Sequence, residues 1–303
     1  MASAIPRDQG SAAAEPFSHG ARFILTLRCP DAIGIVAAVS TFLADRGLSI
    51  DESHQFHDRD NGDFYMRAAF AAPDSARASL DELNAGFAPI ARRFAMSWRI
   101  FDAGSRPKLF LAVSKIGHCL VDLFNRVESG WLRADIVGVF SNHDDLGPIA
   151  QARGAAFHAH PVTPHTKAQA EAALLQAIAA SGAEMLVLAR YMQILTPETC
   201  AALEGRAINI HHSFLPGFKG ARPYHQAHAR GVKIIGATAH YVTPDLDEGP
   251  IIEQAVERVT HQQSAADLVE IGRDLECQVL ARAVRWHIER RVIISGNKTI
   301  VFR

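Results

Sequence analysis

The sequence has few of the features that mark secreted, membrane-bound or nucleic-acid-binding proteins. It contains only four cysteines in 303 residues, and their scattered spacing argues against a disulfide framework or a zinc knuckle. No apolar run is long enough to span a bilayer. A net charge of −1 leaves no broad basic surface for nucleic acid. These absences predict a soluble, cytoplasmic protein with no membrane or nucleic-acid partner.

The 15 histidines could suggest a metal hydrolase. No HExxH or comparable ligand spacing occurs among them. His225 and His228 share one face of a helix predicted over residues 224–230, but no matching carboxylate accompanies them. We therefore predict no metal site, and a metal hydrolase remains the alternative.

The composition of the chain and a stretch that contains Gly and Pro predict two folded units. With 48% apolar and 21% charged residues, the chain can build two hydrophobic cores. Residues 1–20 are rich in Ala, Ser and Gly and lack an apolar signal core, which predicts a flexible tail. We place the first unit at 21–101, a Gly- and Pro-bearing linker at 102–107 and the second unit at 108–303.

The first unit shows strand and helix patterns in the order βαββαβ. Apolar residues recur at helical spacing after Ile35, Gly47 closes that helix, and a turn at 60–62 joins two strands. This order predicts an antiparallel sheet with helices on one face. We expect strands at 23–27, 50–57, 64–71 and 95–100, and helices at 35–45 and 75–87.

The second unit changes to apolar strands that alternate with helices, which is typical of βαβ units. Residues 108–114 read as a strand buried in a parallel sheet, and a long amphipathic helix and a hairpin end the chain. We expect strands at 108–114, 135–141, 185–188, 207–211 and 234–241, helices at 119–128, 167–180 and 264–288, and a hairpin at 291–302.

Three polar residues in this second unit suit chemistry on a formyl or acyl carbon. Asn209 and His211 alternate on one face of a predicted strand, and Asp247 follows a later strand in a loop. An amide N–H can hold a developing oxyanion, an imidazolium can share its charge, and a carboxylate can move a proton. From the residues alone, a solvated Asp and an ordinary His remain the alternative.

The run NIHHSFLPGFKGARPYHQAHARGVKIIGATAHYVTPDLDEGPII, which begins at Asn209, resembles the folate-dependent formyltransferase domain. The resemblance covers residues 106–303 and implies a doubly wound, mostly parallel sheet. It also implies that Asn209, His211 and Asp247 are the catalytic trio, and that no organic cofactor or metal is required. The residues that it places around the folate substrate are Tyr191, Met192, Gln193, Leu195, His240 and Val242. We expect the side chains of Met192 and Ile194 to pack in the core.

The run LRCPDAIGIVAAVSTFLADRGLSI in the first unit resembles an ACT domain. Such domains bind amino acids between paired copies, near the first turn and first helix. The resemblance therefore implies a homo-oligomer with an amino-acid effector near Asp31, Ile33, Gly34 and Ile35. Ser49 stands where the family often has Asn, which leaves the effector unidentified, and a purely structural dimerisation module is the alternative.

The loop that follows the first strand of the second unit separates possible relatives. Residues 115–119 contain one glycine, whereas a phosphate cradle needs several close backbone N–H groups. This loop, together with Gln193 and the run Tyr-His-Gln-Ala at 224–227, is similar to the pattern of formyltetrahydrofolate deformylases. A carboxamide such as that of Gln193 can pair with the donor and acceptor edge of a pterin.

That resemblance implies a hydrolase that acts on a linear C–N amide bond. It would convert 10-formyltetrahydrofolate to formate and tetrahydrofolate, supply formate for purine synthesis and balance one-carbon pools. Asn209 and His211 would stabilise the oxyanion, while Asp247 would position and deprotonate water. Two alternatives stay open: a formyltransferase with a phosphorylated amine acceptor, of the glycinamide ribonucleotide type, or on Met-tRNA, and a non-catalytic amino-acid or folate sensor.

Overall fold

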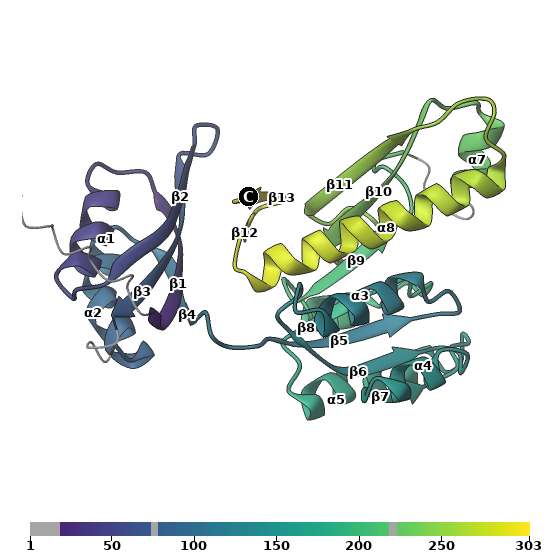
Figure 1. Cartoon of the computed structure of the whole chain (residues 1–303), viewed down its shortest axis with the longest axis horizontal. Helices are drawn as coiled ribbons and strands as arrows, with labels where there is room; N and C mark the ends of the chain where they lie inside the picture. Colours follow the sequence, from purple (N-terminus) through teal and green to yellow (C-terminus); the bar gives the residue numbers. More distant parts are fainter. Residues whose placement is uncertain (1–18, 74–77, 218–222) are drawn as a thin grey trace, which may run out of the picture. The chain divides into compact units, whose positions relative to one another are not determined.

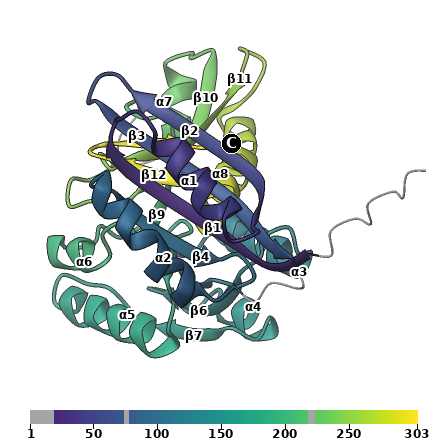
Figure 2. The ribbon, with the colours of Figure 1, turned by 90° about the vertical axis from the view of Figure 1, so that its left-hand side faces the viewer.

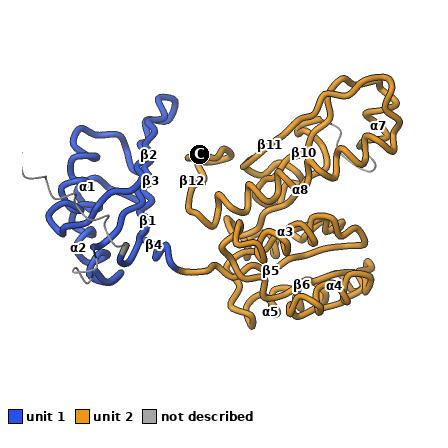
Figure 3. The backbone as a smooth tube through the Cα atoms, viewed as in Figure 1, with its two compact units in different colours: residues 1–104 blue, residues 105–303 orange. Residues whose placement is uncertain are grey.

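A computed structural model describes residues 19–73, 78–217 and 223–303 of the chain. The predicted flexible tail at 1–20 falls outside the described residues up to position 18. The chain forms two compact units, Met1–Gly104 and Ser105–Arg303 (Figure 3). The division between them falls inside the stretch 102–107 that the sequence predicts as a linker.

The first unit has a four-stranded antiparallel sheet in the order β2-β3-β1-β4. Helices α1 and α2 lie on the same face of that sheet (Figure 1, Figure 2), and their apolar residues form one core with the inward residues of the strands. The predicted βαββαβ order is thereby confirmed. Its elements are β1 (His19–Pro30), α1 (Ile35–Ala44), β2 (Ser49–Asp58), β3 (Asp63–Pro73), α2 (Leu80–Arg93) and β4 (Ser97–Asp102).

Helix α2 begins and ends later than the sequence pattern predicts. Of the predicted helix at 75–87, residues 75–77 lie outside the described residues, and the described helix begins after Ser79. The hydroxyl of Ser79 accepts a hydrogen bond from the Glu82 backbone N–H, and the Glu82 carboxylate accepts one from the backbone N–H of Ser79. This capping box sets the helix start. The predicted end at 87 is wrong because the helix continues to Arg93 through Pro89.

The second unit is built on a seven-stranded sheet in the order β11-β10-β9-β8-β5-β6-β7. Strands β5 to β9 pair in parallel, and β10 and β11 add to one edge in antiparallel fashion. The expected doubly wound, mostly parallel sheet is confirmed. Its strands are β5 (Lys108–Val113), β6 (Asp135–Ser141), β7 (Ala156–Ala159), β8 (Met185–Leu188), β9 (Ala207–His211), β10 (Ile234–Tyr241) and β11 (Ile251–Arg258), with the hairpin β12 (Val292–Ser295) and β13 (Lys298–Val301) at the end.

Helices cover both faces of this sheet because its central strands are almost entirely apolar and their successive residues point to opposite faces. Leu109 and Leu111 of β5 join the core beneath α3 and α8, whereas Phe110 and Ala112 join a second core beneath α5 and α6. No helix of the described residues is both long enough and apolar enough to cross a bilayer. The helices are α3 (His118–Glu128), α4 (Gly147–Ala152), α5 (Lys167–Ser181), α6 (Pro197–Ala202), α7 (Pro223–Ala229) and α8 (Ala265–Ile288).

The order of the strands reverses between β5 and β8. From β5 the chain adds β6 and β7 on one side, and from β8 it adds β9, β10 and β11 on the other side. The carboxyl ends of strands at such a reversal form a crevice in which ligands bind. Two hydrogen bonds join the segments that leave these ends. The Ser114 backbone N–H donates to the carbonyl of Arg190 at 3.2 Å, and the Met192 backbone N–H donates to the Ser114 hydroxyl at 2.9 Å.

Candidate active site

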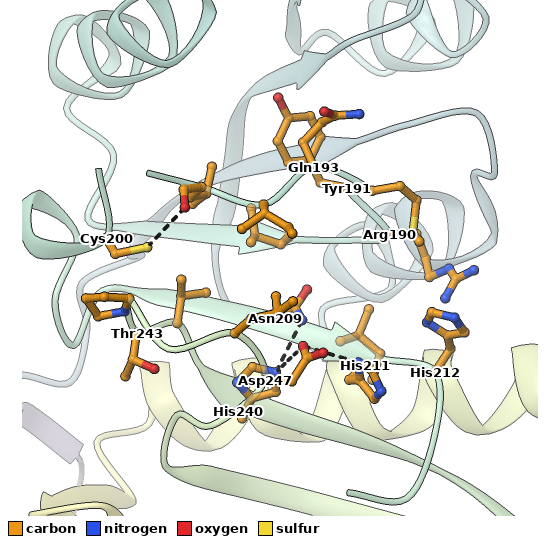
Figure 4. A pocket seen from close by; sticks show the side chains of 18 residues that line it. Arg190, Tyr191, Gln193, Cys200, Asn209, His211, His212, His240, Thr243 and Asp247 are labelled. Carbon is orange, nitrogen blue, oxygen red and sulfur yellow. Dashed lines mark hydrogen bonds and ion pairs between the residues drawn. The ribbon is translucent and has the colours of Figure 1, made fainter. Parts of the chain in front are cut away.

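Two paired strands present the first catalytic candidates. In the register of β9 and β10, Asn209 lies opposite His240, and His211 lies opposite Thr238. Residues that are directly opposite in an antiparallel pair point to the same face of the sheet, as do alternate residues along one strand. Asn209, His211 and His240 therefore face the same side, and all three line one pocket (Figure 4).

Asp247 completes this group from the loop after β10. Its Oδ1 lies 3.2 Å from Nδ1 of His211 and 3.7 Å from Nε2 of His240. Gly249 lets the loop fold back tightly, because a Cβ at that position would lie 1.8 Å from the carbonyl oxygen of Tyr241. Asp247 itself has a φ of 58°, in the left-handed region that costs most residues energy but that Asp and Asn tolerate better.

The carboxyl of Asp247 is held in its ionised form. Burial by itself would raise its pKa, but the interactions with the neighbouring imidazoles, above all the hydrogen bond with His211, outweigh burial and lower the pKa below the ordinary carboxyl value. Asp247 is only 11% exposed, so water screens these interactions weakly. The site therefore holds a fixed negative charge between two imidazoles.

The hydrogen bonds of His240 orient the amide of Asn209. Nδ1 of His240 lies 2.9 Å from the Tyr241 carbonyl oxygen, which can only accept, so Nδ1 carries the proton. Nε2 of a neutral His240 is then an acceptor, and Nδ2 of Asn209 donates to it at 3.2 Å. The Asn209 amide has a second N–H on the same nitrogen, which leaves one donor for a substrate oxygen.

The structure brings all the predicted substrate-binding residues to the same pocket as the predicted trio. Besides Asn209, His211 and Asp247, the pocket lining includes Tyr191, Met192, Gln193, Leu195, His240 and Val242. The prediction that Met192 and Ile194 pack in the core is wrong, since their side chains are 54% and 56% exposed. The chain leaves the sheet after β8, so this segment borders the pocket instead of entering a core.

Sequence reasoning missed a second polar group beside the trio, which we call the Arg190–Glu276 cluster: Arg190, Glu276, His118, Tyr224 and His212. The Glu276 carboxylate is 1% exposed and accepts from Nε2 of His118 at 2.7 Å and from the Tyr224 hydroxyl at 3.0 Å. Nε of Arg190 lies 3.4 Å from the same carboxylate. Arg190 and His212 both line the pocket, and their only sequence signal is adjacency to Tyr191 and His211.

This cluster also has defined charge states. Burial would raise the pKa of Glu276, but the hydrogen bond from His118 and the charge of Arg190 lower it, so Glu276 is ionised. Burial lowers the pKa of His212 to about 4, with further lowering from the charges of Arg190 and His211. At neutral pH the His212 ring, whose centroid is 5.2 Å from that of His211, is therefore uncharged.

Within the described residues, one group of side chains could hold a metal ion. It consists of His118, Cys119 and Cys277, whose ligand atoms all lie within 4.8 Å of one another. Two thiols and an imidazole would suit a soft ion such as zinc. The hydrogen bond with Cys277 and burial both raise the pKa of the Cys119 thiol, which opposes the thiolate that a metal would need. The group contains none of the trio.

In the first unit, the predicted effector residues lie at the start of α1. Gly34 precedes the helix with a φ of 95°, which few residues other than glycine adopt. The side chain of Ile33 is fully exposed, whereas that of Ile35 is 2% exposed and belongs to the core. Oδ2 of Asp31 lies 3.7 Å from Nδ1 of His57. A ligand at this turn could therefore meet Asp31, Ile33 and backbone groups, but not the side chain of Ile35.

Two family models match the chain, one described as ACT domain over residues 23–85 and one as formyl transferase over 107–284. A curated formyltetrahydrofolate deformylase of Corynebacterium sp. (strain P-1) is 50% identical over 286 residues, or 94% of this chain and 100% of that protein. A crystal structure of formyltetrahydrofolate deformylase from Burkholderia mallei is 54% identical, with a TM-score of 0.89, and covers 94% of this chain and 100% of its own.

Glycinamide ribonucleotide transformylase 1 from Symbiobacterium toebii is a more distant solved neighbour. It is 28% identical with a TM-score of 0.62, and the match covers 67% of this chain and 97% of that chain. The deformylases thus match nearly the full length of both proteins, whereas the transformylase leaves about a third of this chain without a counterpart.

Proposed function

This chain belongs to the formyltetrahydrofolate deformylase family, and from that premise we propose that it hydrolyses 10-formyltetrahydrofolate at the site of Asn209, His211 and Asp247. The products are formate and tetrahydrofolate. One observation carries the assignment of the site: an ionised carboxylate, two imidazoles and an oriented carboxamide converge on one pocket.

Hydrolysis of the formyl group requires a new bond from water oxygen to the formyl carbon and cleavage of the bond from that carbon to nitrogen. Negative charge grows on the formyl oxygen as water attacks. When the tetrahedral intermediate collapses, one proton of the original water goes to the leaving nitrogen. The other proton is released, because the carboxylic acid product ionises to formate at neutral pH.

Asn209 and His211 supply the groups that stabilise the oxyanion. The free N–H of the Asn209 amide can donate to the formyl oxygen, since its other N–H is held by His240. Nε2 of His211 is buried and has no hydrogen-bond partner among the described residues, so it is free to donate to the same oxygen when protonated. Preorganised donors of this kind typically contribute about 10²–10³-fold each to the rate.

Asp247 holds the water and pairs with Nδ1 of His211. Its lowered pKa makes the carboxylate a weak base, so it cannot ionise free water to a large extent. As the bond from water to carbon forms, that water becomes strongly acidic, and Asp247 takes the proton and passes it toward the leaving nitrogen. The same negative charge, 3.2 Å from Nδ1, stabilises an imidazolium at His211.

The folate itself is proposed to bind along the segment that follows β8. Tyr191 and Leu195 are buried and give the pocket an apolar wall. The exposed Met192 can cover one ring face, and the carboxamide of Gln193 can pair with a pterin edge. In this proposal folate is the substrate and neither an organic cofactor nor a metal is needed.

We further propose that the enzyme works in the cytoplasm as a homo-oligomer and supplies formate for purine synthesis. All four cysteines are free thiols, as expected in a reducing compartment. We propose that the ACT unit binds an amino-acid effector at Asp31, Ile33 and Gly34, where an exposed side chain and a left-handed glycine border the start of α1.

An assay without an acceptor tests this function against the transferase alternative. The protein is incubated with 10-formyltetrahydrofolate alone and then with glycinamide ribonucleotide added. A hydrolase releases formate steadily in both cases, and the acceptor does not raise folate consumption. Accumulation of formylated acceptor at the rate of folate use would make the chain a transferase, and tight folate binding without turnover would make it a sensor.

A further inference from the structure

Arg190 stands at the point where the strand order of the second sheet reverses. It lies two residues after the end of β8, and its carbonyl accepts from the backbone N–H of Ser114, the residue that follows β5. Its φ of 70° lies in the left-handed region, which costs a residue with a Cβ conformational energy. The fold therefore keeps a strained backbone here, and Arg190 lines the pocket that contains Asn209 and Asp247, with its guanidinium beside the His212 ring (Figure 4).

The guanidinium of Arg190 has donors that the described residues do not use. Its side chain is 11% exposed, yet Nε and Nη1 are buried and lack hydrogen-bond partners among those residues. Glu276 is the nearest carboxylate, with Oε2 at 3.4 Å from Nε of Arg190, and it also accepts hydrogen bonds from His118 and Tyr224. A buried guanidinium keeps its charge and favours forked contacts with a carboxylate.

The charges around the pocket distinguish its two sides. Asp247, beside His211, is ionised and repels an anion. On the other side, His212 is uncharged at neutral pH, so Arg190 is the cation that faces the pocket there. Figure 4 shows the guanidinium next to the His212 ring, with His211 on the far side of that ring and Asp247 beyond it.

We propose that Arg190 forms a binding site for the formate product, beside the catalytic trio; this inference rests on the hydrolysis proposed above. The ligand class is a small planar monocarboxylate or an anion of the same shape. Formate leaves the folate nitrogen with two oxygens and a negative charge that Asp247 repels, and these oxygens can accept hydrogen bonds from the unused donors of Arg190. Formate has three non-hydrogen atoms, which sets its affinity at about millimolar or weaker.

The glutamate tail of folate is another source of carboxylate that this guanidinium could bind. Arg190 is buried, whereas a tail that leads out of the pocket reaches solvent, so the structure favours formate. The two sources are separated by comparing tetrahydrofolate with a tetrahydropteroate that lacks glutamate. If Arg190→Gln weakens binding of the first compound only, Arg190 binds the tail and the formate site is refuted.

Direct binding of ¹³C-formate tests the proposal without any turnover. The full chain, free of folate, is titrated with ¹³C-formate, and the exchange broadening of its NMR signal is followed. We expect saturable binding that azide, a linear anion of similar size, displaces. Arg190→Gln should weaken formate binding about 10- to 100-fold, which is typical of a lost charge-assisted hydrogen bond, and Arg190→Lys should weaken it less.

Lys115→Gln is the matched control, because Lys115 is an exposed cation on the loop after β5 and lies outside the pocket lining. Its formate affinity should equal that of the wild type. Should Arg190→Gln fail to fold with Glu276 left in place, Arg190→Gln/Glu276→Gln removes both charges together and should show the same loss.

Two results overturn the site: no saturable binding in the wild type, or equal formate affinity in the wild type and in a folded Arg190 variant. Formate binding without hydrolysis would refute the proposed function and leave the anion site standing. Hydrolysis together with formate binding that does not change in the Arg190 variants would refute the formate site and leave the proposed function standing.

Discussion

Replacing Asp247 by Asn removes one negative charge from the pocket that we propose as the active site and leaves the loop nearly unchanged. Asn has the same size, and like Asp it tolerates the left-handed backbone that this position requires, with φ at 58°. The amide cannot accept a proton from water, a loss that typically costs about 10²–10⁴-fold in rate.

The rate loss corresponds to about 3 to 5 kcal/mol at the transition state. The variant also loses the carboxylate oxygen that lies 3.2 Å from Nδ1 of His211. We expect kcat to fall by about 10²–10⁴-fold, and folate affinity to stay near the wild-type value.

The assay measures formate release under saturating folate and, separately, the binding of a non-hydrolysable folate by calorimetry. Asp245→Asn is the matched control, because Asp245 is exposed in the same loop and does not line the pocket. Its turnover should be close to that of the wild type. A folded Asp247→Asn protein that hydrolyses folate at near the wild-type rate would refute the role assigned to Asp247.

Three further outcomes are expected. The pKa of His212 is about 4 in the folded protein and about 6.5 in an unfolded chain. The free energy of unfolding is therefore highest above about pH 6.5 and falls by roughly 3 kcal/mol as the pH decreases toward 4, because the unfolded chain takes up the proton first. Urea unfolding at both ends of that range should show the loss, and His212→Gln should reduce it; an unchanged loss would contradict the account. Gly249→Ala places a Cβ against the Tyr241 carbonyl, so stability should fall by about 1–3 kcal/mol together with turnover, and a variant that melts like the wild type would show that the loop is not tightly packed. Residues 105–303 expressed alone should bind folate without responding to amino acids, and a response that persists would place the effector site outside the ACT unit.

Most of the fold could be predicted because its long elements have clear periods. The strands at 135–141 and 207–211 and the start of α5 agree with the sequence pattern to the residue. The elements α4, β7 and α6, with four to six residues each, are too short for a periodic signal. Strand β11, which the sequence pattern also missed, lies at the sheet edge, where exposed and buried residues do not alternate strictly.

The convergence of Asn209, His211 and Asp247 could be predicted because a short motif and one loop contain all three residues. The Arg190–Glu276 cluster could not be, since it joins the start of α3, the loop after β8 and the middle of α8 through side-chain contacts between distant segments. Glu276 sits among buried residues such as Leu275 and Val279 on α8, where its sequence position suggests nothing unusual. A buried carboxylate in such a place becomes informative only when its partners are known.

A single-turnover reaction in ¹⁸O-labelled water tests the central claim most directly, namely that water is the formyl acceptor at this site. The enzyme is mixed with 10-formyltetrahydrofolate in the presence of glycinamide ribonucleotide, and the formate is analysed by mass spectrometry. The account predicts one ¹⁸O atom in each formate and one tetrahydrofolate for each formate. Tetrahydrofolate formed without labelled formate, and matched by formylated acceptor, would contradict it.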